Sequence, residues 1–422
     1  MNILNKRPVV SKDIFIKIDN NKVLLIDSER ANWVVVSQPL AEIILNCDGS
    51  ISIEEIVNEL NIKCSKEFSQ KLLSCFDKLY GLNFINDNGG NIIEQSKALD
   101  SVYFNLTKNC NLKCIYCYAD AGGNATKNAK DQSLGFWKRT IDQLYNLNKN
   151  ATINFTGGEP TIYKYFWNVV EYAKDKGLNL LLITNGSNSK DEDIQKYLNY
   201  FSSIEVSIDS LREEVNSLTR GKDSLFSAQK FIDTLIEKGV QPTILVVVSK
   251  YNESYLYEIN DKYKSSAKIK YQPMYNMGRG DKFESIRMTG KEYYNILKSQ
   301  NIERMKGDIT YKRNMKYVWC GMGLNVLSIE ANGEVYPCQL MHHENFKLGD
   351  LNNQSLEELW MNSPYKDHSV DLIEGCKSCE LKYICSAPCR ARAFYVLGSI
   401  YKKDPLCPDF IKKSIYDNLF EI

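Results

Sequence analysis

The chain has 422 residues, of which 43% are apolar and 25% charged, and its length predicts roughly three domains of ordinary size. Its 53 Lys and Arg residues nearly balance its 52 Asp and Glu residues, so charge gives no reason to expect nucleic acid or an anionic membrane as partner. The N-terminus has no apolar stretch long enough for a signal peptide and no later segment approaches a membrane span, which predicts a cytoplasmic protein.

Thirteen cysteines need an explanation in such a chain, because the cytosol disfavours structural disulfides. Cys47, Cys64 and Cys75 have no metal-binding spacing and are predicted to be small buried apolar side chains. Three more lie close together at 110–117, seven fill the last quarter of the chain, and none lies between these two groups. This clustering indicates metal ligation.

Residues 1–95 predict a small α+β domain. The segment 13–27 alternates around an Asp-Asn-Asn turn and predicts a hairpin, and 32–37 predicts a third strand. Helical spacing follows at 40–49 and 52–61, the second opened by a Ser52/Glu55 capping box, and a third helix is expected at 66–80. The element order is that of a winged helix, but its near-neutral charge argues against DNA binding, and 86–96 has the composition of a linker.

Residues 96–310 alternate strand and helix signals, which predicts parallel strands joined by crossover helices. The expected strands are 101–106, 152–158, 178–186, 202–210, 242–250 and 268–274, and helices are expected at 132–147, 162–176 and 290–306. Six units are fewer than the eight of a closed barrel, so an α/β fold with an open, partial (β/α)6 TIM-like barrel is predicted. A doubly wound open sheet is the alternative that periodicity leaves open.

The stretch "TKNCNLKCIYC" (107–117) places three cysteines on one short loop directly after the first barrel strand. Three thiolates can hold three irons of a [4Fe–4S] cube and leave the fourth iron open to a small molecule. The alternative is a zinc site completed by a distant His or Cys, although this spacing is unusual for zinc.

Cys110, Cys114 and Cys117 have the Cys-x3-Cys-x2-Cys spacing of the radical S-adenosylmethionine (SAM) enzymes, and Tyr116 supplies the aromatic residue common before the third cysteine. The chain therefore resembles that family, and the resemblance makes the three cysteines the catalytic cluster ligands. It also implies that "GGEP" faces the methionine amino group, that "TNG" and "SIDS" end the next strands at SAM, and that the arginine of "LTRG" pairs with the SAM carboxylate. The implied SAM-binding residues are Tyr116, Gly157, Gly158, Glu159, Thr184, Asn185, Ser207, Asp209 and Arg220.

The last cysteines follow a long pattern within residues 311–422. Seven is an odd number for disulfides, and a zinc ribbon would need two Cys-x2-Cys pairs where this region has one. The pattern resembles the SPASM extension of peptide-modifying radical SAM enzymes, which carries two auxiliary iron–sulfur clusters. By that resemblance one cluster is held by Cys320, Cys338 and Cys389, and the other by Cys376, Cys379, Cys385 and Cys407.

Three further positions qualify the resemblance. Val326 stands where some relatives carry an extra cysteine, so the three-cysteine cluster has an open iron or another ligand, and an open iron could bind a substrate thiolate. Gln339 stands where sulfatase-maturing relatives place an aspartate that serves as the base of the reaction, which counts against formylglycine formation. His342 and His343 follow closely and are candidates for a proton acceptor or a ligand, or are loop histidines without a role.

Residues 1–95 resemble the RiPP recognition element, which binds leader peptides by adding a strand to its hairpin edge. The alternative is an accessory domain that packs on the barrel. The whole resemblance implies three [4Fe–4S] clusters, SAM, and a 5′-deoxyadenosyl radical that attacks a ribosomally made, Cys-containing precursor peptide. A flavodoxin or ferredoxin would donate electrons.

The expected product is a thioether crosslink, as made by sactipeptide or ranthipeptide maturases. One alternative is a carbon–carbon or carbon–oxygen crosslink, or oxidative decarboxylation, by the same radical chemistry. The other is an iron–sulfur or zinc protein that binds a peptide without turnover.

Overall fold

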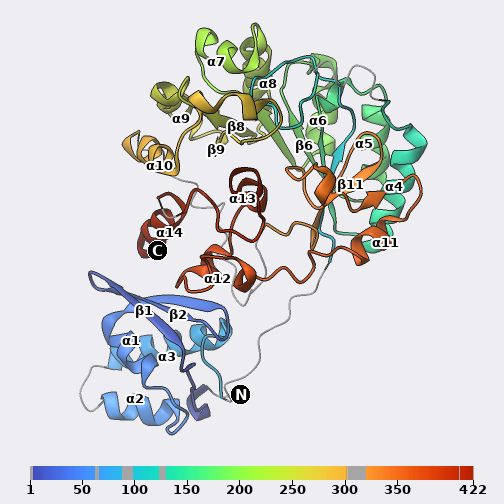
Figure 1. Cartoon of the computed structure of the whole chain (residues 1–422). Helices are drawn as coiled ribbons and strands as arrows, with labels where there is room; N and C mark the ends of the chain where they lie inside the picture. Colours follow the sequence, from blue (N-terminus) through green and yellow to red (C-terminus); the bar gives the residue numbers. More distant parts are fainter. Residues whose placement is uncertain are drawn as a thin grey trace.

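The computed structural model describes residues 3–61, 66–87, 98–122, 130–300, 302, 320–407 and 409–421 (Figure 1). These residues form a three-stranded sheet of order β1-β2-β3 and a nine-stranded sheet of order β12-β11-β10-β4-β5-β6-β7-β8-β9. Cys64 and most of the linker expected at 86–96 lie outside the described residues. No described helix is both long and apolar enough to cross a membrane.

The N-terminal elements follow the sequence prediction closely. The antiparallel strands are β1 (Ile14–Asp19), β2 (Lys22–Asp27) and β3 (Asn32–Ser37), and the helices are α1 (Gln38–Leu45), α2 (Ile53–Asn61) and α3 (Lys66–Gly81). The capping box before α2 is present, because the Ser52 backbone N–H donates to Glu55 and the Glu55 N–H donates to the Ser52 hydroxyl at 3.2 Å.

In the N-terminal sheet, β2 and the first half of β3 are buried on both faces, whereas β1 is largely exposed. Val23, Leu25 and Val34 pack under the three helices, whereas Leu24, Ile26 and Trp33 face the opposite way and join the large core of the molecule. On that second face, Lys17 lies 3.6 Å from the ring centre of Tyr416 in α14 (Ile411–Glu421). Figure 1 shows α12 (Lys382–Cys385) and α14 lying between this sheet and the barrel. The N-terminal sheet therefore packs on the C-terminal region.

The six predicted barrel strands are present and pair in parallel in their sequence order. They are β4 (Ser101–Asn105), β5 (Thr152–Thr156), β6 (Asn179–Thr184), β7 (Ser203–Ser207), β8 (Thr243–Val248) and β9 (Lys268–Pro273). A doubly wound sheet reverses its strand order at a switch point, and this sheet does not reverse between β4 and β9. The partial-barrel prediction is confirmed.

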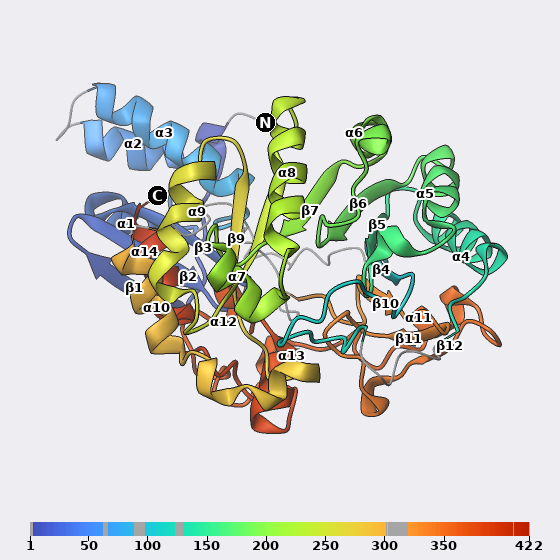
Figure 2. The same cartoon turned by 90° about the horizontal axis from the view of Figure 1, so that it is seen from above.

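The barrel helices cover one face of this curved sheet (Figure 2). They are α4 (Leu134–Leu147), α5 (Phe166–Asp175), α6 (Ile194–Tyr200), α8 (Ser224–Glu237), α9 (Leu256–Tyr263) and α10 (Gly290–Ser299), whereas α7 (Glu213–Arg220) lies beyond the carboxyl end of β7, where its Arg220 contacts Asp209. Their apolar sides pack on outward strand residues such as Phe104 and Phe155. The intervening residues face inward and include polar side chains, such as Asn105, which donates to Ser328 at 2.9 Å.

The C-terminal region extends the barrel sheet, which the sequence reading did not predict. β10 (Val326–Ile329) pairs in parallel with β4, and β11 (Glu334–Tyr336) and β12 (Gly349–Asp350) continue antiparallel. The remaining helices are α11 (Leu356–Met361), α12 and α13 (Arg390–Leu397). Because β10 runs parallel to β4, its carboxyl end lies at the same edge of the sheet as the loop that carries the first cysteines.

Candidate functional site

The first cysteine loop follows β4 and packs directly on the turn after β5. The Gly158 N–H donates to the Thr107 carbonyl at 2.7 Å, and the Glu159 N–H donates to the Asn109 carbonyl at 2.9 Å. A side chain at Gly158 would collide with the Asn109 carbonyl oxygen, and a Cβ at Gly157 would lie 2.6 Å from the Thr107 oxygen. The two glycines are therefore required for this close approach.

The segment after β9 also holds the loop in place, through Arg279, which no sequence motif predicted. The Arg279 Nε donates to the Cys114 carbonyl at 2.9 Å, and its Nη1 reaches the Ala121 carbonyl and the Asp120 carboxylate, each at 2.8 Å. The Arg279 backbone N–H also donates to the Cys117 carbonyl at 3.0 Å. The only sequence signal was an arginine in a Gly-rich stretch at the end of the sixth strand.

Glu159 is fully buried at the junction of β5 and β6. Its carboxylate accepts from the Thr161 hydroxyl at 2.7 Å, the Thr184 hydroxyl at 2.8 Å and the Asn185 N–H at 2.8 Å. Burial raises the pKa of Glu159, and these donors oppose that rise. Asn185 in turn lies 3.8 Å from the Cys110 sulfur, so the structure brings these predicted residues together.

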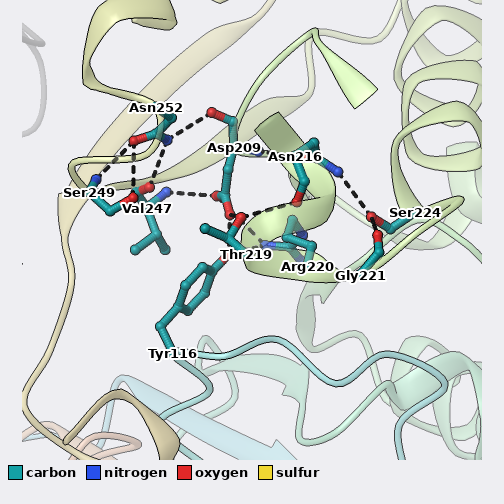
Figure 3. Close-up of polar contacts among 10 residues, drawn as sticks. All are labelled: Tyr116, Asp209, Asn216, Thr219, Arg220, Gly221, Ser224, Val247, Ser249 and Asn252. Carbon is teal, nitrogen blue, oxygen red and sulfur yellow. Dashed lines mark hydrogen bonds and ion pairs between the residues drawn. The ribbon is translucent and has the colours of Figure 1, made fainter. Parts of the chain in front are cut away.

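Tyr116, Asp209 and Arg220 form one buried network (Figure 3). The Tyr116 hydroxyl donates to Asp209 at 2.5 Å and accepts from Arg220 Nη1 at 2.6 Å, and Arg220 lies 3.8 Å from the other Asp209 oxygen. Asp209 also accepts from the Thr219 hydroxyl at 2.7 Å and the Val247 N–H at 3.1 Å. Burial raises the pKa of Tyr116 well above its usual value. The network ties the cysteine loop to the ends of β7 and β8.

Two buried asparagines support this network and were missed by the sequence reading. Asn216 accepts from the Asp209 N–H at 2.9 Å, and Asn252 donates to the Asp209 carbonyl at 2.8 Å. Single asparagines carry no recognisable motif, so no signal could have found them. Ser207 was predicted to contact SAM, and it ends β7 half-buried, in register with Leu245.

Charge effects among the ten clustered cysteines follow the three predicted sets, and cluster binding by these sets stays a prediction. Burial raises the pKa of Cys110 to about 11, and the nearby charges of its two partners on the loop add to that rise. Burial also raises the pKa of Cys338, and the charges of Cys320 and Cys389 add to that rise. In the same way, burial and the charges of Cys376, Cys379 and Cys407 raise the pKa of Cys385. We call these the first set (Cys110, Cys114, Cys117), the second set (Cys320, Cys338, Cys389) and the third set (Cys376, Cys379, Cys385, Cys407).

The donor chemistry of these sets fits iron–sulfur clusters. The described cysteines are free thiols. Among the described residues, no three His, Cys, Asp or Glu side chains are placed so that they could hold a single metal ion. A [4Fe–4S] cube instead spreads its thiolates over different irons. Burial raises the pKa of Cys320 and of Cys376 to about 11, so binding a cluster releases thiol protons. Cys47 is buried as predicted and Cys75 is half-buried.

The two candidate histidines have different surroundings. His342 contacts Glu330 through Nδ1 and the Ser328 hydroxyl through Nε2, each at 2.8 Å. Burial raises the pKa of Glu330, but His342 and Lys108 outweigh it, so that pKa lies below its usual value. His343 caps a short helical turn by accepting from the Asn345 N–H at 3.2 Å. His342 is thus joined to the inner edge of β10, and His343 is a local structural residue.

Two family models match the chain. Residues 104–262 match the radical SAM superfamily, and residues 320–380 match the SPASM iron–sulfur cluster-binding domain. Mycofactocin maturase MftC of Mycolicibacterium smegmatis is 26% identical over 341 residues, which is 75% of this chain and 85% of that protein. The subtilosin biosynthesis protein AlbA of Bacillus subtilis is 27% identical over 271 residues, 62% of this chain and 59% of AlbA. Fe-coproporphyrin III synthase of Methanosarcina barkeri is 24% identical over 360 residues, 72% of this chain and 87% of that protein.

Solved structures share the fold. The structure of anSMEcpe with bound AdoMet has a TM-score of 0.59 at 20% identity and covers 76% of this chain and 96% of that one. Streptococcus suis SuiB bound to S-adenosylmethionine has a TM-score of 0.58 at 15% identity and covers 95% of this chain and all of that one. The SuiB match therefore extends over the N-terminal elements as well as the barrel.

Proposed function

Since the chain belongs to the radical SAM superfamily and carries a SPASM iron–sulfur domain, we propose that it forms thioether links at cysteines of a ribosomally made precursor peptide. It is an enzyme that uses SAM and several [4Fe–4S] clusters, so the zinc and the non-catalytic alternatives are dropped. The names of two relatives, a maturase and a bacteriocin biosynthesis protein, support a peptide substrate.

The proposal assigns SAM and its cluster to the loop between β4 and α4. When bound there, they supply a 5′-deoxyadenosyl radical that can take a hydrogen atom from an unactivated carbon. The first set would hold the cluster, and Gly157, Gly158, Glu159 and Asn185 would shape the SAM site beside it. The buried links of Tyr116 to Asp209 and Arg220 would keep the loop at the barrel edge, because a displaced loop would misplace the reacting atoms.

The observation that carries the thioether assignment is the unequal number of cysteines in the second and third sets. Four thiolates complete a [4Fe–4S] cube, whereas the three of the second set leave one position for another ligand. A substrate thiolate suits that position. Each link forms when a carbon loses a hydrogen atom and a thiol loses its proton and one electron, so a one-electron acceptor is required. The C-terminal cysteine sets are suited to hold one.

We assign leader-peptide binding to residues 1–95, SAM chemistry to 96–310 and the auxiliary clusters to 311–422. Among the described residues β1 pairs only with β2, and its Phe15, Ile16 and Ile18 are 36%, 45% and 59% exposed. An exposed edge strand with apolar side chains can accept a peptide as an added strand. We expect Ile16→Asp with Ile18→Asp to weaken leader-peptide binding at least tenfold. The matched control is Phe226→Asp, an exposed apolar residue of α8.

The test of the reaction is the mass of a Cys-containing precursor peptide after anaerobic turnover with SAM and reductant, followed by thiol alkylation. We expect loss of two hydrogens per link, with one thiol protected from alkylation each time. Cys114→Ala should abolish SAM cleavage. A loss of two hydrogens with every thiol still alkylated would instead establish a carbon–carbon or carbon–oxygen link. The reductant would be a flavodoxin or ferredoxin, and the content of free cysteines favours the cytoplasm.

A further inference from the structure

Arg390, at the start of α13, is a buried guanidinium held only by neutral groups. Its side chain is 1% exposed. Its Nε donates to the Ala387 carbonyl at 3.2 Å, and its Nη1 donates to the carbonyls of Ile400 at 2.8 Å and Lys402 at 2.6 Å. Its Nη2 is buried without a hydrogen-bond partner in the part of the chain that the structure describes. Three carbonyls orient this cation but supply no opposite charge.

The neighbouring Arg392 shows how a buried arginine is usually neutralised. Arg392 binds the buried carboxylate of Asp404 with two bonds of 2.8 and 2.7 Å. No described Asp or Glu forms an ion pair with Arg390. A buried charge without a counter-charge costs several kcal/mol, so such groups are normally paired. The described residues around Arg390 therefore supply no anion.

The groups around Arg390 come from both C-terminal cysteine sets. In the chain, Arg390 directly follows Cys389 of the second set. Cys320 and Cys376 also pack on the same small apolar cluster, which contains Ala387. Arg390 is thus hydrogen-bonded to Ala387, whose apolar cluster contacts Cys320 of the second set and Cys376 of the third set.

His368 gives an independent sign that this region is built around a group of other chemistry. The residue is 6% exposed, and neither ring nitrogen has a hydrogen-bond partner among the described residues. Burial, with a smaller effect of Arg390, lowers the pKa of His368 to about 4, so the ring is neutral at pH 7. Buried polar atoms rarely stay unpaired, yet both His368 and Arg390 carry such atoms. The His368 ring lies 5.1 Å from the ring of Tyr401, which stands between the two residues whose carbonyls bind Arg390 Nη1.

We propose that Arg390 is the shared counter-ion of the two auxiliary iron–sulfur clusters and raises the reduction potential of both. A cluster held by thiolates carries negative charge, and adding an electron makes it more negative. A fixed cation in a low-dielectric interior stabilises the reduced form more than the oxidised form. Because one cation serves both sites, its removal should change both together. The inference concerns the cofactors and does not depend on which peptide is modified.

The experiment is a redox titration of the reconstituted full-length protein, followed by electron paramagnetic resonance. Arg390→Gln should shift the midpoint potentials of both auxiliary clusters downward and leave that of the first-set cluster unchanged. Arg390→Lys keeps the charge and should restore most of the shift. Unchanged auxiliary potentials in Arg390→Gln, or an equal shift of all three clusters, would overturn the proposal.

A second pair of variants keeps the proposal testable if Arg390→Gln fails to bind iron. His368→Glu places a carboxylate beside the intact Arg390 and should lower the same two potentials, whereas His368→Gln is the neutral control of similar size. Iron content and circular dichroism identify variants that have lost a cluster or the fold. Equal potentials in the two His368 variants would contradict the role of Arg390 charge.

Discussion

Arg279→Met tests whether the clamp after β9 holds the first cysteine loop in place. Methionine keeps much of the apolar length of the side chain but removes the bonds to the Cys114 and Ala121 carbonyls, which are 2.9 and 2.8 Å long. A hydrogen bond with a charged donor contributes roughly 1.5–3 kcal/mol. The ion pair to Asp120, whose side chain is 48% exposed, adds at most about 1 kcal/mol.

The local stability of the loop should therefore fall by about 3–7 kcal/mol. Even the lower value corresponds to an increase of more than about 100-fold in the population of the opened loop. Hydrogen exchange measured by mass spectrometry should show faster exchange confined to 107–122. Iron content should fall by the share of one cluster, and SAM affinity should fall with it.

Two matched variants control this experiment. Arg279→Lys keeps the charge but not the branched set of donors, so it should give an intermediate effect. Arg212→Met removes an arginine that binds Glu258 on the exposed surface, and the loop should exchange at the wild-type rate. If Arg279→Met exchanges as slowly as wild type and keeps its iron and SAM affinity, the clamp has no role in holding the loop.

Three further predictions concern Gly158, Asp209 and His368. Gly158→Ala should lower the free energy of unfolding by about 1–3 kcal/mol, because its side chain would collide with the Asn109 carbonyl, and it should impair loading of the first cluster, measured by iron content. The control is Gly135→Ala in α4, where no atom lies closer than 3.7 Å to the added Cβ, and it should be neutral or stabilising. Equal effects of the two variants would refute the collision. Asp209→Asn removes the carboxylate that accepts from the Tyr116 hydroxyl and faces Arg220, and it should weaken SAM binding at least tenfold, measured by calorimetry. Unchanged SAM affinity would show that Asp209 does not position the SAM site. His368 has its pKa lowered from 6.5 to about 4 in the folded protein, so the unfolded chain takes up the proton first as pH falls. The contribution of His368 to the free energy of unfolding is complete above pH 6.5 and declines by about 3 kcal/mol toward pH 4. The free energies of unfolding in urea at pH 7 and pH 5 should therefore differ less in His368→Gln than in the wild type. An identical pH dependence of the two proteins would contradict this prediction.

The barrel could be predicted from the sequence because its signals are local, whereas the cluster ligands stay a prediction from cysteine spacing. Buried parallel strands read as apolar runs between helices, so all six strands were found, and cysteine spacing on a short loop limits which sulfurs can meet. The grouping of the C-terminal cysteines came from a family resemblance and stays a prediction. The Ser52 and Glu55 capping box was found for the same reason, since its two residues are three apart.

The tertiary structure alone decided which distant segments complete the site. β10 joins β4 across more than 200 residues, and that pairing brings Ser328 and Glu330 to the inner edge of the barrel. Arg279 reaches the cysteine loop from beyond β9, and Asn216 and Asn252 hold the backbone of Asp209. These contacts depend on how whole elements pack, and a single arginine or asparagine carries no periodic signal. The sequence determined what could bind iron and SAM, and packing determined which side chains position the ligands and which charge was left without a partner.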